Sequence, residues 1–260
     1  MKNNLLASIL VAAALGEVAA TAQTFTYNSG DLLAAFRKSG SPDLIVDLGS
    51  IANYQSATSV SSVSLGADLT TTFGSTSGIY WSVFTYDGNG TYAPVNTLFM
   101  SDPRSDVNVE NTPPVTGTSS QQDLVTGQLG AMADALSSTY GTIIDNQVIQ
   151  LPNGLGATSG GDPASYTTAL GSSFDFNGTY RQNFENLSSG TTATVSDLFQ
   201  QNPSPLHNPG AGNYLGNFTL GTDGTMTFTP VSAVPEPSTL AMIGTGMMGL
   251  VAFRRLAKRN

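Results

Sequence analysis

The middle of the chain alternates short β-favouring runs with clusters of Gly, Asn, Asp, Ser and Pro. Runs of this kind, bounded by turn residues, are typical of β-strands. Three pairs of runs predict antiparallel neighbours: Asp31–Arg37 with Leu44–Leu48, Ile79–Tyr86 with Thr97–Ser101, and Tyr214–Leu220 with Thr225–Thr229. Asp-Gly steps at Asp87 and Asp223 strengthen two of the connecting turns. A short helix over Leu32–Phe36 is the alternative to the first of these strands.

One segment instead repeats its apolar residues with the period of a helix. The apolar positions recur at i, i+4, i+7 and i+11 and are Val125, Leu129, Met132 and Leu136. This spacing places them on one helical face. It predicts a helix over Gln121–Thr139, with Ser119 or Ser120 as its N-cap and Gly141 as its stop signal.

Together these elements predict a mainly β fold. We expect one antiparallel β-sandwich, for which a jelly roll is a candidate topology, with one or two short helices. A division into two subdomains near Asn111–Ser120 is the alternative. Because side chains alternate across a strand, Tyr80 and Trp81 point to opposite faces. We expect Trp81 in the core and the Tyr80 face in solvent, where its aromatic rings could stack on sugars.

The N-terminus predicts a cleaved signal peptide over residues 1–22. A lysine near the start precedes the apolar run Leu5–Leu15, and Ala20 and Ala22 occupy the small-residue positions before Gln23. This order is typical of a secretory signal with its cleavage site. It makes the Sec export machinery and signal peptidase expected partners.

The C-terminus predicts a membrane helix over about 239–253. This uncharged segment has fifteen residues, which would span roughly 22 Å as a helix, less than the hydrocarbon core of about 30 Å. Four basic residues follow directly: Arg254, Arg255, Lys258 and Arg259. They can snorkel to the interface, and they place the C-terminus in the cytoplasm and the preceding body outside.

A Pro-Glu-Pro motif comes just before this apolar segment, at Val234, Pro235, Glu236 and Pro237. The motif, the apolar helix and the Arg-rich end together resemble the PEP-CTERM sorting signal of exported bacterial proteins. The resemblance implies a transient inner-membrane anchor, cleavage near the motif by an exosortase (a membrane protease-transpeptidase), and release or transfer to the cell surface. It also implies an association with exopolysaccharide production. An ordinary anchor that is never processed is the alternative.

These signals divide the chain into a signal peptide, a β-rich exported domain at 23–233 and a sorting tail at 234–260. Residues 23–237 keep four basic and seventeen acidic residues, which gives a net charge of about −13. That charge excludes a nucleic-acid-binding role, which requires a basic surface. The chain has no cysteine, so disulfides and thiolate chemistry are excluded as well.

Calcium is the most plausible ligand in the acidic turns, although no resident cofactor is expected. Asp102 and Asp106, and also Asp87 and Asn89, place oxygen ligands close together, as hard cations require. Neither turn continues into an EF-hand, because the position that needs a glutamate after Asp87 is Leu98. Asp and Asn also favour turns by bonding to their own backbone, so a structural role is the alternative.

Signals for catalysis are sparse. His207 is the single histidine, and no GxSxG motif accompanies it. Glycoside hydrolysis needs two carboxylates across a cleft, and the glutamate candidates are Glu110, Glu185 and Glu236. Sequence spacing places no pair of them together.

The sequence therefore predicts a non-enzymatic exported protein of the cell surface or extracellular matrix. We expect a structural or adhesive role, with extracellular polysaccharide as a candidate partner. A secreted hydrolase that acts on polysaccharide is the alternative.

Overall fold

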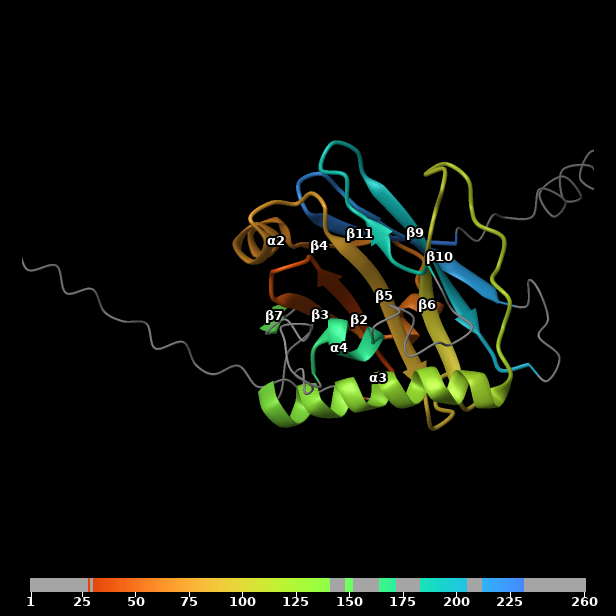
Figure 1. Ribbon diagram of the computed structural model, residues 1–260. Coiled ribbons are helices and arrows are strands. Elements are labelled where there is room, and N and C mark those ends of the chain that lie inside the picture. Colours follow the sequence, from red (N-terminus) through yellow and green to blue (C-terminus); the bar gives the residue numbers. More distant parts are fainter. Residues whose placement is uncertain are drawn as a thin grey trace, which may run out of the picture.

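In the computed structural model, the described residues are 28, 30–140, 148–151, 164–171, 183–204 and 212–231. They contain ten strands and four helices (Figure 1). The strands are β2 (Asp31–Arg37), β3 (Asp43–Ser50), β4 (Ser61–Ser64), β5 (Tyr80–Asp87), β6 (Thr97–Pro103), β7 (Val148–Leu151), β8 (Asn186–Leu187), β9 (Thr194–Gln201), β10 (Asn213–Leu220) and β11 (Thr225–Pro230). The helices are α1 (Ala52–Gln55), α2 (Gly66–Phe73), α3 (Ser119–Tyr140) and α4 (Tyr166–Leu170).

The strands form one antiparallel sheet in the order β4-β11-β10-β9-β6-β5-β2-β3-β7, with β8 paired to β5. The predicted mainly β, antiparallel class is confirmed, but the two packed sheets of a sandwich are not found among the described residues. The β6–β9 pairing, from Leu98↔Gln201 to Pro103↔Ser196, joins the N-terminal and C-terminal strands directly. This pairing also argues against two subdomains. Local alternation predicts which residues are buried but does not determine which distant strands pair.

The sheet curls into a half-barrel around one of its own faces. A hydrophobic cluster on this concave face joins residues of β2, β3 and β5 to residues of β10 and β11, including Phe218 and Phe228. After β3 the chain passes through α1 to the far edge of the sheet, where β4 pairs with β11. It then returns through α2 to β5 (Figure 1). The segment between β3 and β5 therefore helps to close the concave side.

The opposite face of the sheet is covered by α3 and α4 (Figure 1). Helix α3 confirms the predicted helix, and its four periodic apolar residues are buried against the sheet. The N-cap is Thr118, so the predicted N-cap at Ser119 or Ser120 is wrong, and both serines are the first residues of the helix. The backbone N–H of Thr118 donates to Gln121 Oε1 at 3.0 Å, while its Oγ1 accepts from the Gln121 N–H at 3.4 Å. This reciprocal pair is a capping box.

The predicted alternation along β5 is confirmed, but its exposed face is not. Trp81 is fully buried on the concave face. Phe84, expected in solvent on the Tyr80 face, is also buried, because Tyr166 of α4 stacks on it with a centroid distance of 5.6 Å. Only Tyr80, at the start of the strand, is substantially exposed. The apolar stripe of α3 predicted that this helix packs on another element, but no local pattern showed that it would cover this face of β5.

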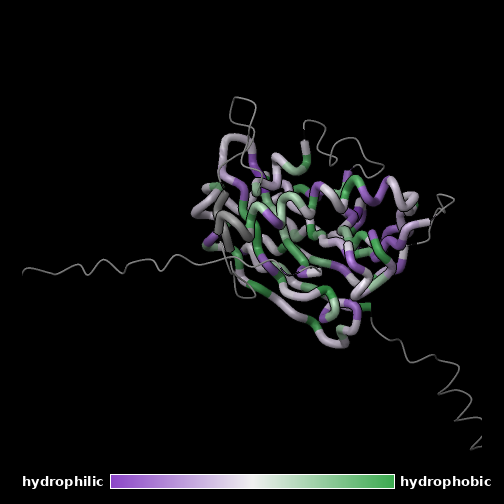
Figure 2. Tube along the Cα trace, turned by 90° about the horizontal axis from the view of Figure 1, so that it is seen from below, coloured by the Kyte–Doolittle hydropathy of each residue, from purple (hydrophilic) through white to green (hydrophobic). Residues whose placement is uncertain are grey.

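All three predicted strand pairs are confirmed. Leu32–Phe36 is a strand, because it pairs with both β3 and β5. Figure 2 shows hydrophobic and polar residues interleaved along the chain. Strand β9 was not predicted. It is a central strand whose buried residues include Ser196 and Asp197, so it lacks the apolar run expected of one.

In the part of the chain that the structure describes, no helix combines the length and the apolar character needed to cross a membrane. The predicted signal peptide and the predicted membrane helix both lie outside the described residues.

The start of α2 packs tightly against the β10–β11 turn. A Cβ built on Gly224, whose φ is +79°, would lie 2.5 Å from Gly66 Cα and 2.8 Å from Gly66 N. Gly40 has an almost identical φ of +78°, yet a Cβ there would meet nothing within 4 Å. The two glycines therefore separate the cost of the backbone conformation from the cost of the contact.

We expect Gly40→Ala to lower the free energy of unfolding by about 1–2 kcal/mol, the cost of a left-handed conformation. Gly224→Ala should cost roughly 2–5 kcal/mol, because overpacking against α2 is added. Urea denaturation of both variants measures the difference. Equal losses would show that α2 does not pack against this turn as described.

Candidate functional site

A pocket of about 300 Å³ lies on the concave side, between α1, β4 and the β10–β11 hairpin. Its position follows from the crossing of the chain from β3 to β4, which holds the segment after β3 against the far end of the sheet. Eleven residues line it: Leu48, Asn53, Tyr54, Ala57, Ser59, Ser61, Ser62, Val63, Phe218, Met226 and Phe228. They come from segments far apart in the sequence, so only the fold brings them together.

Three aromatic rings that pack on one another line the pocket: Tyr54 is half-buried, and Phe218 and Phe228 are buried. The ring of Tyr54 meets that of Phe228 edge-on at a centroid distance of 5.0 Å and that of Phe218 at 5.7 Å. The rings of Phe218 and Phe228 are 4.9 Å apart. The Tyr54 hydroxyl donates to the Leu48 carbonyl oxygen at 2.8 Å. These contacts fix the ring of Tyr54 in place, since aromatic pairs at such distances are favourable.

The rim of the pocket is polar and uncharged. It consists of Asn53, Ser59, Ser61 and Ser62, all exposed. Within the described part of the chain, none of these four side chains makes a hydrogen bond to another residue. The Asn53 amide and the Ser61 hydroxyl are therefore available to a ligand as donors and acceptors, whereas Ser62, the next residue of β4, points to the other face of the strand. Among the described lining residues there is no Asp, Glu, His, Lys or Arg.

Helix α1 is held in place independently of any ligand. Gln55 donates from Nε2 to Gln200 Oε1 at 3.1 Å and to the Tyr92 carbonyl oxygen at 3.3 Å. On the other side of the pocket, β4 is fixed by its pairing with β11, in which Ser61 lies opposite Phe228. The pocket is therefore pre-formed, which reduces the entropic cost of binding.

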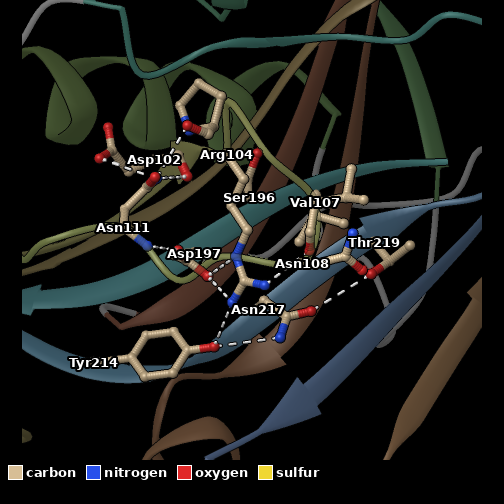
Figure 3. A network of polar contacts seen from close by, with 12 residues as sticks. Asp102, Arg104, Val107, Asn108, Asn111, Ser196, Asp197, Tyr214, Asn217 and Thr219 are labelled. Carbon is tan, nitrogen blue, oxygen red and sulfur yellow. Dashed lines mark hydrogen bonds and ion pairs between the residues drawn. The ribbon is translucent and has the colours of Figure 1, made fainter.

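A second polar feature lies on the convex side of β9 and β10 (Figure 3). Arg104 follows β6 and forms a buried ion pair with Asp197 of β9, with Nε 2.7 Å and Nη2 2.6 Å from Asp197 Oδ1. The same guanidinium donates to the Tyr214 hydroxyl at 3.1 Å and to the Val107 carbonyl oxygen at 3.0 Å. The Asp197 side chain is completely buried and that of Arg104 is 9% exposed.

Asn111 attaches the loop after β6 to this ion pair. Its backbone N–H donates to Asp197 Oδ2 at 2.7 Å, and its side-chain amide donates to the carbonyl oxygens of Asp102 and Pro103 at 3.1 and 3.0 Å. Both oxygens of the buried Asp197 carboxylate are therefore satisfied. The arrangement fastens the loop between β6 and α3 across β9, which is a structural role.

A third polar cluster joins β2, β5 and α4. Arg37 forms an ion pair with Glu185, and Nε lies 2.8 Å from Oε1. The Tyr166 hydroxyl donates to the same oxygen at 2.9 Å and lies 2.6 Å from Ser82 Oγ. Burial, together with the Glu185 carboxylate, raises the pKa of Tyr166 well above its ordinary value. Arg37 also stacks over the ring of Tyr80 at 4.4 Å.

Asp43 anchors the first turn of α4. Its carboxylate accepts from Ser165 Oγ, and from the N–H and hydroxyl of Thr167 at 2.8 and 2.7 Å. Burial raises the pKa of Asp43, although these hydrogen bonds act in the opposite direction. The groups around Arg37 and Asp43 are thus bonded to one another and hold α4 against the sheet.

Asp87, a predicted calcium ligand, organises the β5–β6 loop. Its Oδ1 accepts from the backbone N–H groups of Asn89, Gly90 and Thr91 at 3.3, 2.8 and 3.0 Å. Its Oδ2 accepts from the N–H groups of Tyr92 and Ala93. Asn89 Oδ1 accepts from the N–H and hydroxyl of Thr91. The Asp87 carboxylate is completely buried. It therefore has the structural role that was the alternative to calcium binding, because it bonds to the backbone of its own turn.

Asp102 and Asp106, the other predicted calcium ligands, each accept a hydrogen bond from a different nearby residue. Asp106 Oδ1 accepts from the backbone N–H of Asn108 at 3.0 Å, and Asp102 Oδ2 accepts from the Asn111 amide at 3.4 Å. Within the described ranges, no group of three or more His, Asp or Glu side chains is placed to hold a metal ion. Calcium binding at these residues stays a prediction.

The remaining predicted residues are not brought into one site. Glu110 is exposed on the loop after β6, and Glu185 is in the ion pair with Arg37. His207 and Glu236 lie outside the described residues. So do the signal-cleavage residues, the Pro-Glu-Pro motif and the C-terminal basic residues. The pocket residues were not predicted, because no local pattern links Asn53–Val63 to the β10–β11 hairpin.

Comparison with known protein families gives a match at the C-terminus. The described body is a mainly antiparallel β domain with a neutral pocket. Residues 233–256 match the PEP-CTERM protein-sorting motif. The chain therefore carries this motif at its C-terminus, which implies export and membrane-associated sorting by an exosortase-type machinery. No curated protein and no solved structure matches the chain.

The buried ion pair gives a test of the loop anchor. Arg104→Met should lower the free energy of unfolding by roughly 3–5 kcal/mol, because it leaves the Asp197 carboxylate buried without its counter-ion. Adding Asp197→Asn to that variant removes the charge and keeps an oxygen for the Asn111 N–H, so it should restore part of the loss. Thermal and urea denaturation measure both. A double variant no more stable than Arg104→Met would contradict this account of Asp197.

Proposed function

We propose that this protein is a non-enzymatic component of the cell surface or extracellular matrix, with a structural or adhesive role. In this proposal it reaches that place through Sec export, signal peptidase cleavage and exosortase-type processing. The pocket between α1, β4 and the β10–β11 hairpin contacts carbohydrate there.

The chemistry of the pocket carries this proposal. The half-buried ring of Tyr54 and the exposed hydroxyl and amide groups beside it supply what a sugar ring needs, which is an apolar surface and hydrogen-bond partners. The same lining offers no carboxylate pair for general acid–base chemistry, which glycoside hydrolysis requires. It is suited to binding a glycan without cleaving it.

The carboxylates inside the described body favour the same reading. Asp87 holds a loop, Asp197 fastens the segment after β6, and Glu185 pairs with Arg37. Each is engaged in a contact that stabilises the fold. The alternative of a secreted polysaccharide hydrolase would need two carboxylates facing each other across a cleft. Glu185 is instead paired with Arg37, and Glu110 is exposed on the loop after β6.

Replacing the sorting motif tests the route. Pro235→Ala combined with Glu236→Ala should leave the protein in the inner membrane, because the processing enzyme would no longer recognise the tail. Fractionation and immunoblotting measure the distribution between membrane and medium. Pro230→Ala, outside the motif, is the matched control. Release of the double variant at the normal rate would contradict processing at this motif.

A glycan array tests the role. Residues 23–237 should bind at least one extracellular polysaccharide, and the binding should persist in EDTA because the pocket lining holds no metal-ligating carboxylate. Release of reducing sugar from the bound glycan would support the hydrolase instead. Binding to no polysaccharide, with or without EDTA, would remove support for adhesion through carbohydrate.

A further inference from the structure

We infer that the pocket recognises an uncharged sugar unit of a glycan, about one pyranose ring in size, and discriminates against uronic acids and other anionic sugars. This inference rests on the proposed function and specifies its ligand. It is carried by the size of the pocket, the position of its polar groups and its electrostatics.

The size of the pocket limits the ligand. At about 300 Å³, it lies at the small end of the range for ligand pockets, roughly 300–1,000 Å³. A single ring with its substituents fits this space, whereas the rest of a polysaccharide must remain outside. The exposed rim at Ser59 and Ser62 leaves room for a chain to enter and leave.

The arrangement of the lining favours a sugar over a purely apolar ligand. The apolar face of a pyranose ring can lie against Tyr54, which is half-buried, while the buried Phe228 supports the Tyr54 ring edge-on, with an interplanar angle of 80°. Its hydroxyl groups then reach the Asn53 amide and the Ser61 hydroxyl. An apolar ligand would displace water from these groups without replacing the hydrogen bonds, which costs binding energy.

The charge of the protein disfavours anionic sugars relative to neutral ones. The lining contains no Arg or Lys to pair with a carboxylate or sulfate. The exported body carries a net charge of about −13 over residues 23–237, so its field repels anions. A neutral sugar avoids both penalties, because it needs no counter-ion and meets no long-range repulsion.

Strand β4 provides a matched pair of variants. Ser61 lies opposite Phe228 and lines the pocket. Ser64, on the same strand, lies opposite Thr225 and is not part of the lining. Both serines are exposed. Ser61→Trp should therefore fill the pocket, whereas Ser64→Trp adds the same side chain to the same edge strand without blocking it.

The experiment uses the full chain in mild detergent, titrated by NMR with methyl glycosides of glucose, galactose, mannose and N-acetylglucosamine. Methyl glucuronide and methyl galacturonide are the charged counterparts. At least one neutral glycoside should shift the amide signals of residues that line the pocket. Its uronide counterpart should bind at least about ten-fold more weakly at low salt, with the difference shrinking as salt screens the field.

The variants then locate the site. Ser61→Trp should abolish binding of the neutral glycoside, and Ser64→Trp should leave it unchanged. Asn53→Ala, on the exposed side of α1, should weaken binding roughly five-fold, as expected for one lost hydrogen bond. This variant keeps the test decisive if Ser61→Trp fails to fold.

Three results would overturn the inference: equal binding of a uronide, binding that survives Ser61→Trp in the folded protein, or no response of the pocket to any neutral glycoside. Array binding that persists in Ser61→Trp would leave the adhesive function standing and reject only this pocket. Loss of all glycan binding by the wild-type chain would reject the proposed function itself.

Discussion

The pairing of β6 with β9 is the constraint on which the rest of the structure depends. It connects strands separated by α3, β7, α4 and β8 in the sequence, and it runs from Leu98↔Gln201 to Pro103↔Ser196. Without it, the β2–β3–β5–β6 strands and the β9–β10–β11 strands would be separate sheets. With it, the sheet has enough strands side by side to curl. Strands β3 and β10 then both contact α1.

Buried charges fasten the loops to this sheet. The Asp197–Arg104 pair holds the segment after β6 across β9, while Asp87 gathers five backbone N–H groups of the β5–β6 loop around one carboxylate. Each buried carboxylate is satisfied, which is the condition under which burying it is tolerated. In an acidic chain with few basic residues, two of the four cations in the exported body, Arg37 and Arg104, are committed to these structural pairs.

The candidate binding site is a consequence of the same curl. Tyr54 reaches Phe218 and Phe228 because α1 crosses the concave side between β3 and β4. The pocket is left where this crossing segment does not fill the space over the β10–β11 hairpin. Since its lining is neutral and pre-formed, it is suited to select an uncharged ligand by shape and hydrogen bonding.

The sequence by itself determined the local and terminal features. Alternation predicted the hairpins, the 3.6-residue period predicted α3, and the Pro-Glu-Pro motif before an apolar run predicted the sorting tail, because each signal is contained in neighbouring residues. Only the tertiary structure decided that the strands form one sheet and that helices cover Phe84. It alone joined Ser61 to Phe228 in a pocket. These outcomes depend on contacts between distant segments, whose pairing no local pattern specifies.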